Sequence, residues 1–311
     1  MGVFVEQERA MKRLTREKVI YAMCSNNKEV LRCRSGETVV FETQDCFAGQ
    51  ISEENQTMAT LDFDHTNPAT GPLFVEEAQP GDILKVEILD IQVAERGVMC
   101  QIPGEGVTGA LIEAEATRIV PVRNGKCLLC EREIPIDPMI GVIGVAPQKG
   151  ISISTGTPDT HGGNMDCNQI KKGSTLYLPV FVQGALLSMG DLHAVMGDGE
   201  VCVCGVEISG QVTCRVSVLH GALPTPFLVG KDRCMTIYSA PTLDEAAEGA
   251  VLRMQKLLGE RLHMGMTQAG FLMSACGHAR ICQMVDPNKT VRMEIPREIF
   301  EDFLSRLENS L

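Results

Sequence analysis

Residues 174–219 read STLYLPVFVQGALLSMGDLHAVMGDGEVCVCGVEISGQVTCRVSVL, and this stretch decides the fold class. Its three runs at 174–183, 201–208 and 211–219 are rich in β-branched residues or alternate apolar with polar residues, a pattern typical of β-strands. Glycine and aspartate cluster between the first two runs, where they favour a turn. The stretch therefore predicts consecutive strands joined by a glycine-rich connection at 190–200.

The same pattern continues towards the N-terminus. Strand-like runs occupy 37–43, 82–93 and 150–155, and proline- and glycine-rich loops separate them. Helical periodicity is nearly absent between residues 20 and 240. These observations predict a mainly β fold, a sandwich or barrel-like domain with long loops, over residues 1–240.

The pattern changes after residue 240. Thr242 and Glu245 form a capping-box signature ahead of a helix-period run to 262, and a second helix is predicted at 264–276. A strand pair is predicted at 278–286 and 289–296. A final amphipathic helix is expected to start at Pro296, with its apolar stripe formed by Ile299, Phe300, Phe303, Leu304 and Leu307. Residues 241–311 are thus expected to form a small α+β unit.

Charge and hydropathy exclude several classes of protein. The 311-residue chain carries a net charge of −12 and has a pI near 5.0, so it would repel the phosphates of nucleic acids. It has no apolar run of the roughly 18 residues needed to span a membrane. The N-terminus lacks a signal-peptide pattern, so a cytoplasmic protein that binds neither nucleic acid nor membranes is expected.

The thirteen cysteines do not indicate a disulfide framework, because their number is odd and they are scattered through apolar segments. Cys127 and Cys130 form a CxxC motif, but no second motif follows at the spacing of a zinc ribbon. The sequence favours buried, reduced cysteines.

The connection GDLHAVMGDGE, residues 190–200, carries the first candidate site. Asp191 and His193 are two residues apart, so in extended backbone both side chains point the same way. The glycines at 197 and 199 would let Asp198 or Glu200 approach the same point, and Glu207 follows in the next predicted strand. One nitrogen and several oxygens suit zinc or another divalent ion. The alternative is a turn with a capping aspartate and a hydrogen-bonded histidine.

The second candidate segment is THGGNMD, residues 160–166. Gly162 and Gly163 follow His161 and suggest backbone that approaches a ligand closely, with amide groups directed at an oxyanion. Asn164 and Asp166 add an amide and a carboxylate. An ordinary glycine-rich turn remains the alternative reading for this segment alone.

A third segment, LDFDHTNPATGP at 61–72, places Asp62, Asp64 and His65 just before a rigid double turn. His65 is therefore a further candidate metal ligand. The QPGD motif at 79–82 is interpreted as a turn that precedes a strand.

Several long motifs of the chain resemble the acetamidase/formamidase family of short-chain amide hydrolases, from about residue 37 to residue 295. They are DFDHTNPATGP, AQPGDILKVEILDI, GVIGVAP, HGGNMD, LPVFVQGALLSMGDLHAVMGDGEVCVCGVEI and ICQMVDPNKTVRMEIP. The resemblance implies a mainly β fold with a small C-terminal α/β part. It also implies hydrolysis of an amide to carboxylate and ammonia, with a divalent metal in the pocket.

By this resemblance the family's site maps onto the two glycine-rich loops. The positions carried over are His161, Gly162, Gly163, Asn164, Asp166, Asp191, His193, Asp198, Glu200 and Glu207. The chain departs from the expected pattern at Asp159-Thr160 and at Gly277-His278. These departures bear on the identity of the substrate, and neither touches the acid and histidine set.

The resulting hypothesis is metal-assisted hydrolysis of short aliphatic amides such as formamide or acetamide. The predicted catalytic residues are Glu200, Glu207, Asp166 and Asn164, with Gly162 and Gly163 at the oxyanion. The predicted metal ligands are Asp191, His193, His161 and His65. Zinc is the first choice of cofactor, and calcium or another divalent ion is the alternative. Serine-amidase and Cys167 nitrilase-like routes fit the sequence less well.

A different class of function stays open, namely a non-catalytic β-sandwich that binds a carboxylate or a sugar through a metal. The surplus of acidic residues favours the hydrolase. The apolar final helix and the GALPTPFLVG loop suggest a homo-oligomer, with a dimer as the simplest form.

Overall fold

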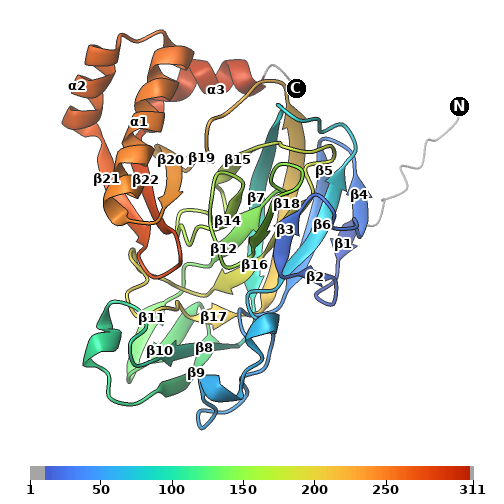
Figure 1. The fold of residues 1–311 in the computed structure, drawn as a ribbon, viewed down its shortest axis with the longest axis vertical. Helices are drawn as coiled ribbons and strands as arrows, with labels where there is room; N and C mark the ends of the chain where they lie inside the picture. The colour runs from blue at the N-terminus through green and yellow to red at the C-terminus, as the bar shows by residue number, and fades with distance from the viewer. Residues whose placement is uncertain (1–10, 309–311) are drawn as a thin grey trace, which may run out of the picture.

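The computed structural model describes residues 11–308, with side chains described up to residue 305 (Figure 1). The strands are β1 (Lys12–Leu14), β2 (Val19–Ile20), β3 (Ala22–Cys24), β4 (Leu31–Cys33), β5 (Glu37–Thr43), β6 (Ala69–Val75), β7 (Ile83–Val93), β8 (Arg96–Gln101), β9 (Ala116–Arg123), β10 (Lys126–Leu129), β11 (Arg132–Pro135), β12 (Met139–Gly144), β13 (Ser152–Ser154), β14 (Gly162–Asn164), β15 (Thr175–Pro179), β16 (Leu187–His193), β17 (Glu207–Ile208), β18 (Gly210–Leu219), β19 (Phe227–Val229), β20 (Arg233–Ala240), β21 (His278–Gln283) and β22 (Lys289–Pro296). The helices are α1 (Leu243–Leu262), α2 (Met266–Cys276) and α3 (Glu301–Glu308), with short 3-10 turns η1 (Met58–Thr60), η2 (Phe63–His65), η3 (Thr108–Leu111) and η4 (Arg297–Phe300).

Two large sheets dominate the molecule, which confirms the predicted mainly β fold. The first has nine strands in the order β1-β5-β18-β7-β15-β19-β20-β22-β21. The second contains the path β11-β10-β9-β8-β17-β16-β12-β14, and β6 joins it by pairing with β16, β2 and β4. A buried hydrophobic cluster that includes Val86, Leu176, Ile143 and Leu192 draws on strands of both sheets. The core therefore packs the two sheets against each other, as alternating apolar residues require.

The predicted strands at 37–43, 82–93 and 211–219 match β5, β7 and β18 closely. The predicted strand at 201–208 is wrong over most of its length, because only β17 at its end is a strand. Glu200 and Val203 have φ angles of 47° and 80°, so the chain turns here instead of extending. This turn brings residue 200 back towards β16.

The C-terminal helices lie together at the β20–β22 end of the nine-stranded sheet, far from β8–β11 (Figure 1). The capping box that begins α1 is confirmed, since the Thr242 side chain accepts from the Glu245 amide and Glu245 bonds back to Thr242. The predicted final helix begins with the 3-10 turn η4 and becomes α-helical only at Glu301.

Strands β21 and β22 continue the nine-stranded sheet through β20, and a second hydrophobic cluster lies under the helices. The proposed division into domains at residue 240 stays a prediction.

All thirteen cysteines are free, and most are buried, as the sequence favoured. Within residues 11–308 no helix is both long and apolar enough to cross a membrane.

Candidate active site

The centre of the candidate site is the C-terminal end of β16. This strand lies between β12 and β17 in the second sheet, and its last residue, His193, pairs with Glu207 across the β16–β17 ladder. The side chains of both residues are almost completely buried, at 1% and 2% exposure. The sequence correctly placed Glu207 on the strand that neighbours His193.

Four carboxylates surround one ring nitrogen of His193. Nε2 lies 3.0 Å from Oε1 of Glu207 and 3.5 Å from Oδ1 of Asp191. It lies 3.9 Å from Oδ1 of Asp166 and 3.9 Å from Oε1 of Glu200. The structure thus brings together residues from β16, β17 and the loops after β14 and β16. We call these five residues the acid–histidine cluster.

The backbone at three of these acids adopts the left-handed conformation. Asp166, Asp191 and Glu200 have φ angles of 42°, 53° and 47°. Such angles are uncommon outside glycine and store strain that the surrounding fold must hold. The expected proximity of Asp191 and His193 is correct, but the reason is not, because Asp191 is not in extended backbone.

Two glycines make room for the cluster. A Cβ at Gly141 of β12 would lie 2.5 Å from Oδ2 of Asp191 and closer still to Oδ1 of Asp166. A Cβ at Gly205 would lie 2.7 Å from Nδ1 of His193. Real Cβ atoms do not approach so closely, so both positions must lack a side chain for the acids and the imidazole to occupy these places.

Burial controls the protonation of the acids. It raises the pKa of Asp166 to about 7, with the neighbouring Asp191 adding to the effect, and it raises the pKa of Glu207 to about 8. Burial and the charge of Asp166 also raise the pKa of Glu200 well above the ordinary range. So many carboxylates cannot all be ionised in a buried site without a cation.

His193 and Asp191 shift in the opposite sense, towards their charged forms. Burial alone would lower the pKa of His193, but the carboxylates of Glu207 and Asp191 outweigh it and raise that pKa. Burial would likewise raise the pKa of Asp191, yet the positive charge of His193 prevails and lowers it. The imidazole therefore serves here as the counter-charge to a surplus of acids.

The cluster has the donors that a divalent metal ion requires. Several buried atoms have no hydrogen-bond partner, among them Oδ1 of Asp166, Oδ1 of Asp191, Nε2 of His193 and Oε2 of Glu207. Unpaired buried polar atoms are costly, and a cation would satisfy them together. Donor atoms of Asp166, Asp191 and His193 lie within 4.8 Å of one another, as do those of His193, Glu200 and Glu207. These residues therefore fit a metal ion.

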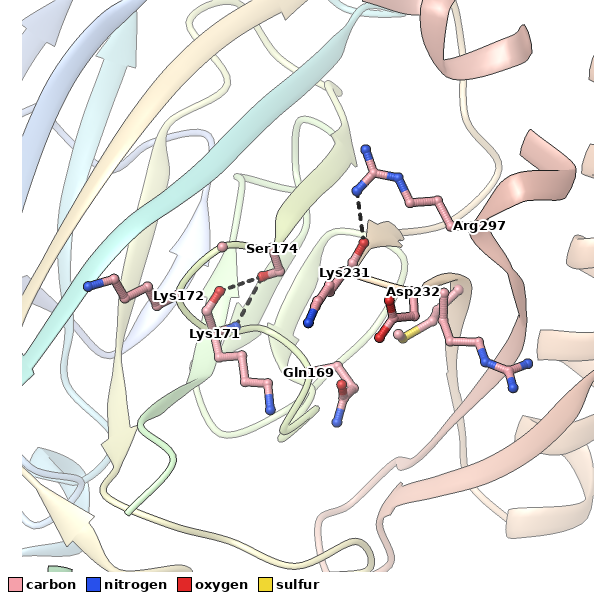
Figure 2. A pocket seen from close by; sticks show the side chains of 11 residues that line it. Gln169, Lys171, Lys172, Ser174, Lys231, Asp232 and Arg297 are labelled. Carbon is pink, nitrogen blue, oxygen red and sulfur yellow. Dashed lines mark hydrogen bonds between the residues drawn. The ribbon is translucent and has the colours of Figure 1, made fainter. Parts of the chain in front are cut away.

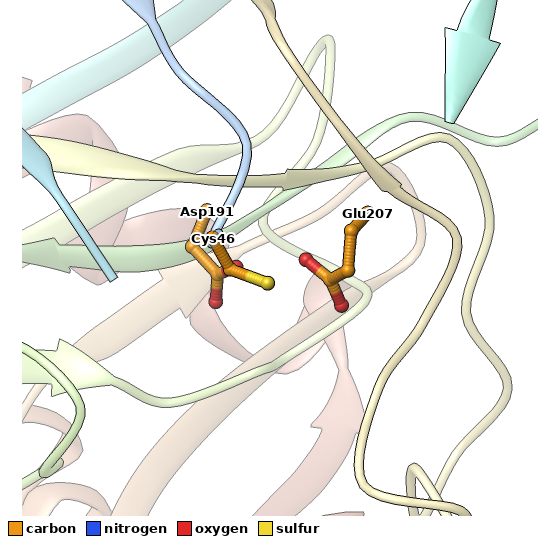
Figure 3. Close-up of side chains that lie close together, drawn as sticks. All are labelled: Cys46, Asp191 and Glu207. Carbon is orange, nitrogen blue, oxygen red and sulfur yellow. The ribbon is translucent and has the colours of Figure 1, made fainter. Parts of the chain in front are cut away.

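A thiol that the sequence did not identify also reaches the cluster. Figure 3 shows Cys46 beside the carboxylates of Asp191 and Glu207, and its sulfur and one oxygen of each acid lie within 4.8 Å of one another. Cys46 lies in the loop after β5, far away in the sequence, and nothing in its local pattern indicates a ligand. A nitrogen, oxygen and sulfur donor set is typical of zinc.

His161 and Asn164 from the first glycine-rich loop are both buried. Neither ring nitrogen of His161 has a hydrogen-bond partner, and burial lowers the pKa of this residue to about 4, so the ring is neutral near pH 7. Asn164 donates from Nδ2 to Oδ2 of Asp286 at 2.9 Å, and its Oδ1 has no partner. Asp286, which the sequence reasoning also missed, thus fixes the orientation of the Asn164 amide.

Gly162 and Gly163 have a structural reason for being glycine. Their φ angles are 96° and 86°, and a Cβ at Gly162 would overlap the carbonyl oxygen of Ile143 on β12. The amide of Gly162 donates to the carbonyl of Asp159 at 3.0 Å, so it is not available to an oxyanion. An oxyanion role for Gly163 stays a prediction.

His65 lies apart from the cluster. Its side chain is 58% exposed, and Nδ1 lies 2.6 Å from Oδ2 of Asp62 in the 3-10 turn η2. It belongs to none of the described groups of metal-type donors. We therefore leave His65 out of the proposed ligand set.

A separate hollow of about 540 Å³ lies between the turn at 169–174 and the β19–β20 turn (Figure 2). It is lined by cationic side chains and one carboxylate, Asp232; the cations are Lys171, Lys172, Lys231, Arg233 and Arg297. None of the acid–histidine cluster lines it, so the hydrolytic chemistry is not placed there.

Comparison with known proteins shows that the cluster lies within a region that matches a known family. The model of the acetamidase/formamidase family matches residues 25–157 and 150–229, which include every member of the cluster. The structure is similar to that of an acetamidase from Bacillus halodurans, at 46% identity and a TM-score of 0.91, with 94% of this chain and 99% of that chain covered.

Two curated relatives extend the comparison. The chain is 27% identical to the formamidase of Methylophilus methylotrophus over 86% of each chain. It is also 28% identical to a putative formamidase of Schizosaccharomyces pombe, where the match covers 60% of this chain and 61% of that protein.

Proposed function

This chain belongs to the acetamidase/formamidase family and is an amidase that acts on short linear amides, and from that premise we propose how its residues carry out metal-assisted hydrolysis. The observation that carries the proposal is the ring of four carboxylates around Nε2 of His193, with unpaired buried oxygens facing one another. This is more negative charge than a buried site can hold without a cation.

Asp191, His193, Asp166 and Glu207 would hold the metal ion, with Cys46 beside them. Zinc is the proposed ion because nitrogen, oxygen and sulfur donors are all present, and calcium or another divalent ion is the alternative. When bound, the metal supplies a Lewis acid that polarises the amide carbonyl and makes water more acidic. His161 as a further ligand stays a prediction.

Glu200 is the proposed general base. Its carboxylate is farther from His193 than that of Glu207, and Glu200 also lines an open pocket beside the cluster. A carboxylate positioned beside the metal ligands can take a proton from water and then return it to the leaving nitrogen. The reaction is amide plus water to carboxylate plus ammonium, so both protons of the water end on the leaving nitrogen and the carboxylate that moves them is not consumed.

Asn164 is proposed to position the substrate. Its Oδ1 is a buried acceptor without a partner, and Asp286 fixes the side-chain amide from the other end. That oxygen can accept a hydrogen bond from the N–H of a primary amide, which holds the leaving nitrogen in place.

Ammonia release from formamide and acetamide, measured before and after removal and return of zinc, tests this function. We expect turnover to disappear with the chelator and to return with the metal. Unchanged turnover in protein whose metal content is below a tenth of an equivalent would contradict metal assistance.

The cytoplasmic location and the homodimer predicted from the sequence remain proposals, and light scattering tests the dimer against the chain mass of 33.8 kDa.

A further inference from the structure

A pocket of about 280 Å³ opens beside the acid–histidine cluster. Glu200 forms part of its wall, and so does Gly205, where an added Cβ would collide with the ring of His193. The pocket therefore reaches Glu200, the proposed general base. A substrate that enters it can present its amide to Glu200.

The rest of the wall is almost entirely apolar. Side chains from three separate parts of the chain supply it, chiefly Met99 of β8, Leu129 of β10, Ile134 of β11 and Val195 and Met196 after β16. No lysine, arginine or histidine lines it. Of its two acids, Asp198 is held by Nη1 and Nη2 of Arg292 at 2.8 and 2.9 Å, so only Glu200 remains for the substrate.

The size of the pocket exceeds the needs of the smallest amides. A volume near 280 Å³ equals that of about nine waters. Formamide has no carbon beyond its carbonyl and acetamide has only a methyl group, so both would leave most of the apolar wall in contact with water. A longer uncharged acyl group would bury that wall, which is favourable.

We infer that the preferred substrates are primary amides with an uncharged, apolar acyl group of several carbons, and that Leu129 and Ile134 help set this preference. The inference rests on the proposed function, since it assumes that Glu200 faces the scissile amide. An acyl group that carries a carboxylate is disfavoured, because its charge would be buried against the apolar wall, which offers no lysine, arginine or histidine to balance it.

The test compares kcat/KM for formamide, acetamide, butyramide, hexanamide and the anionic succinamate, with zinc supplied. We expect each methylene that enters the pocket to raise kcat/KM by up to about fourfold. Butyramide should exceed formamide by at least about tenfold, and succinamate should fall below butyramide. A kcat/KM that falls steadily from formamide to hexanamide would overturn the inference while leaving amide hydrolysis intact.

Leu129→Trp fills the pocket, and Leu128→Trp is its matched control. Leu128 precedes Leu129 on β10, is 50% exposed and lines a different hollow. Leu129→Trp should lower kcat/KM for butyramide about tenfold and leave formamide within about threefold, whereas Leu128→Trp should change neither. If Leu129→Trp does not fold, Ile134→Trp takes its place. Equal effects on formamide and butyramide would contradict the assignment.

A binding measurement separates this inference from the proposed function. Hexanamide should raise the melting temperature of the zinc-loaded protein more than formamide does, and Leu129→Trp should remove the difference. If no amide is hydrolysed but hexanamide still stabilises the protein, the proposed function fails and the pocket assignment stands. If hexanamide does not stabilise the protein, the pocket assignment fails whether or not formamide is hydrolysed.

Discussion

Nε2 of His193 lies 3.0 Å from Oε1 of Glu207, across the short pairing between β16 and β17. The same oxygen of Glu207 accepts the amide N–H of Gly205 at 3.0 Å, while its other oxygen has no partner. Glu207 is thus held at one oxygen and free to bind a cation at the other. This suits a ligand better than a base that must move a proton.

Glu200→Gln should lower kcat for butyramide or acetamide by a factor of about 10² to 10⁴, because glutamine cannot take a proton from water. Bound zinc should stay near the wild-type amount, since the cluster keeps its other donors. Initial rates and metal analysis of the same preparation check both expectations. Glu105→Gln, at an exposed position, is the control, and Glu200→Gln retaining turnover within tenfold would refute the role of this residue.

Glu207→Gln should also lose turnover, but for a different reason. The amide has one oxygen instead of two and loses the charge that balances the metal and His193, so we expect metal affinity to fall about 10-fold to 100-fold. Titration with zinc in the presence of a competing chelator distinguishes this variant from Glu200→Gln. Equal metal affinities in the two variants would contradict the assignment of Glu207 as a ligand and Glu200 as a base, and weaker zinc binding in Glu200→Gln would reverse it.

Asp191→Asn should lose metal and activity together. Asp191 contacts His193 and belongs to two of the groups of metal-type donors, and its pKa is lowered, so it is ionised and ready to bind a cation. Far-UV circular dichroism should stay close to that of the wild type, because the side chain belongs to the site and not to the hydrophobic core. Full zinc content in this variant would remove Asp191 from the ligand set.

The sequence predicted the strand-rich fold and most of the cluster because those features are local. Alternating apolar residues mark β5, β7 and β18, and the glycine-flanked acids mark the two loops. Cys46 could not be found in this way, since the fold alone brings the loop after β5 to β16 and β17. The sequence could not show that His65 lies apart from the cluster, because only the fold places Asp62, Asp64 and His65 in a turn exposed to solvent. Its role as a metal ligand stays a prediction.

The left-handed backbone at Asp166, Asp191 and Glu200 was also beyond the sequence, because propensity assigns such angles to glycine first. It explains why 201–208 failed as a strand and why Glu200 turns back to the cluster. Sequence propensities mislead where a functional site requires strained backbone. Here the three residues with unexpected φ angles all belong to the acid–histidine cluster.

Gly141→Ala tests whether close approach by β12 shapes the site. The added methyl group would collide with the carboxylates of Asp166 and Asp191, so these must move and the donors must separate. We expect zinc affinity and turnover to fall at least about tenfold. Gly270→Ala in α2 is the matched control, because its Cβ would meet nothing closer than 3.7 Å and alanine favours the helix. Unchanged zinc binding in Gly141→Ala would show that the cluster tolerates displacement.

The pH dependence of the metal-free protein provides the last prediction. The pKa of Asp166 rises to about 7 and that of Glu207 to about 8 on folding, both mainly by burial, and the pKa values of Glu200 and Asp286 rise as well. Between about pH 4.5 and pH 8 the folded state therefore holds protons that the unfolded state has released, so stability falls as pH rises.

His193 acts in the same direction, because its raised pKa contributes stability that is lost as pH rises through the folded value. Asp191 and His161 act in the opposite direction, since their pKa values are lowered. The effect of Asp191 lies below about pH 4, and that of His161 ends near its unfolded value of about 6.5, where the several raised groups outweigh it. The melting temperature of the chelated protein should accordingly fall by several degrees from pH 5 to pH 8. Excess zinc should restore most of the loss at pH 8, because the ion replaces the protons and binds only the folded state.

Glu200→Gln, which removes one of the buried acids, should show a shallower decline of the melting temperature without metal. A melting temperature that rises steadily from pH 5 to pH 8 in the chelated protein would mean that the buried carboxylates are balanced by something other than protons or a cation.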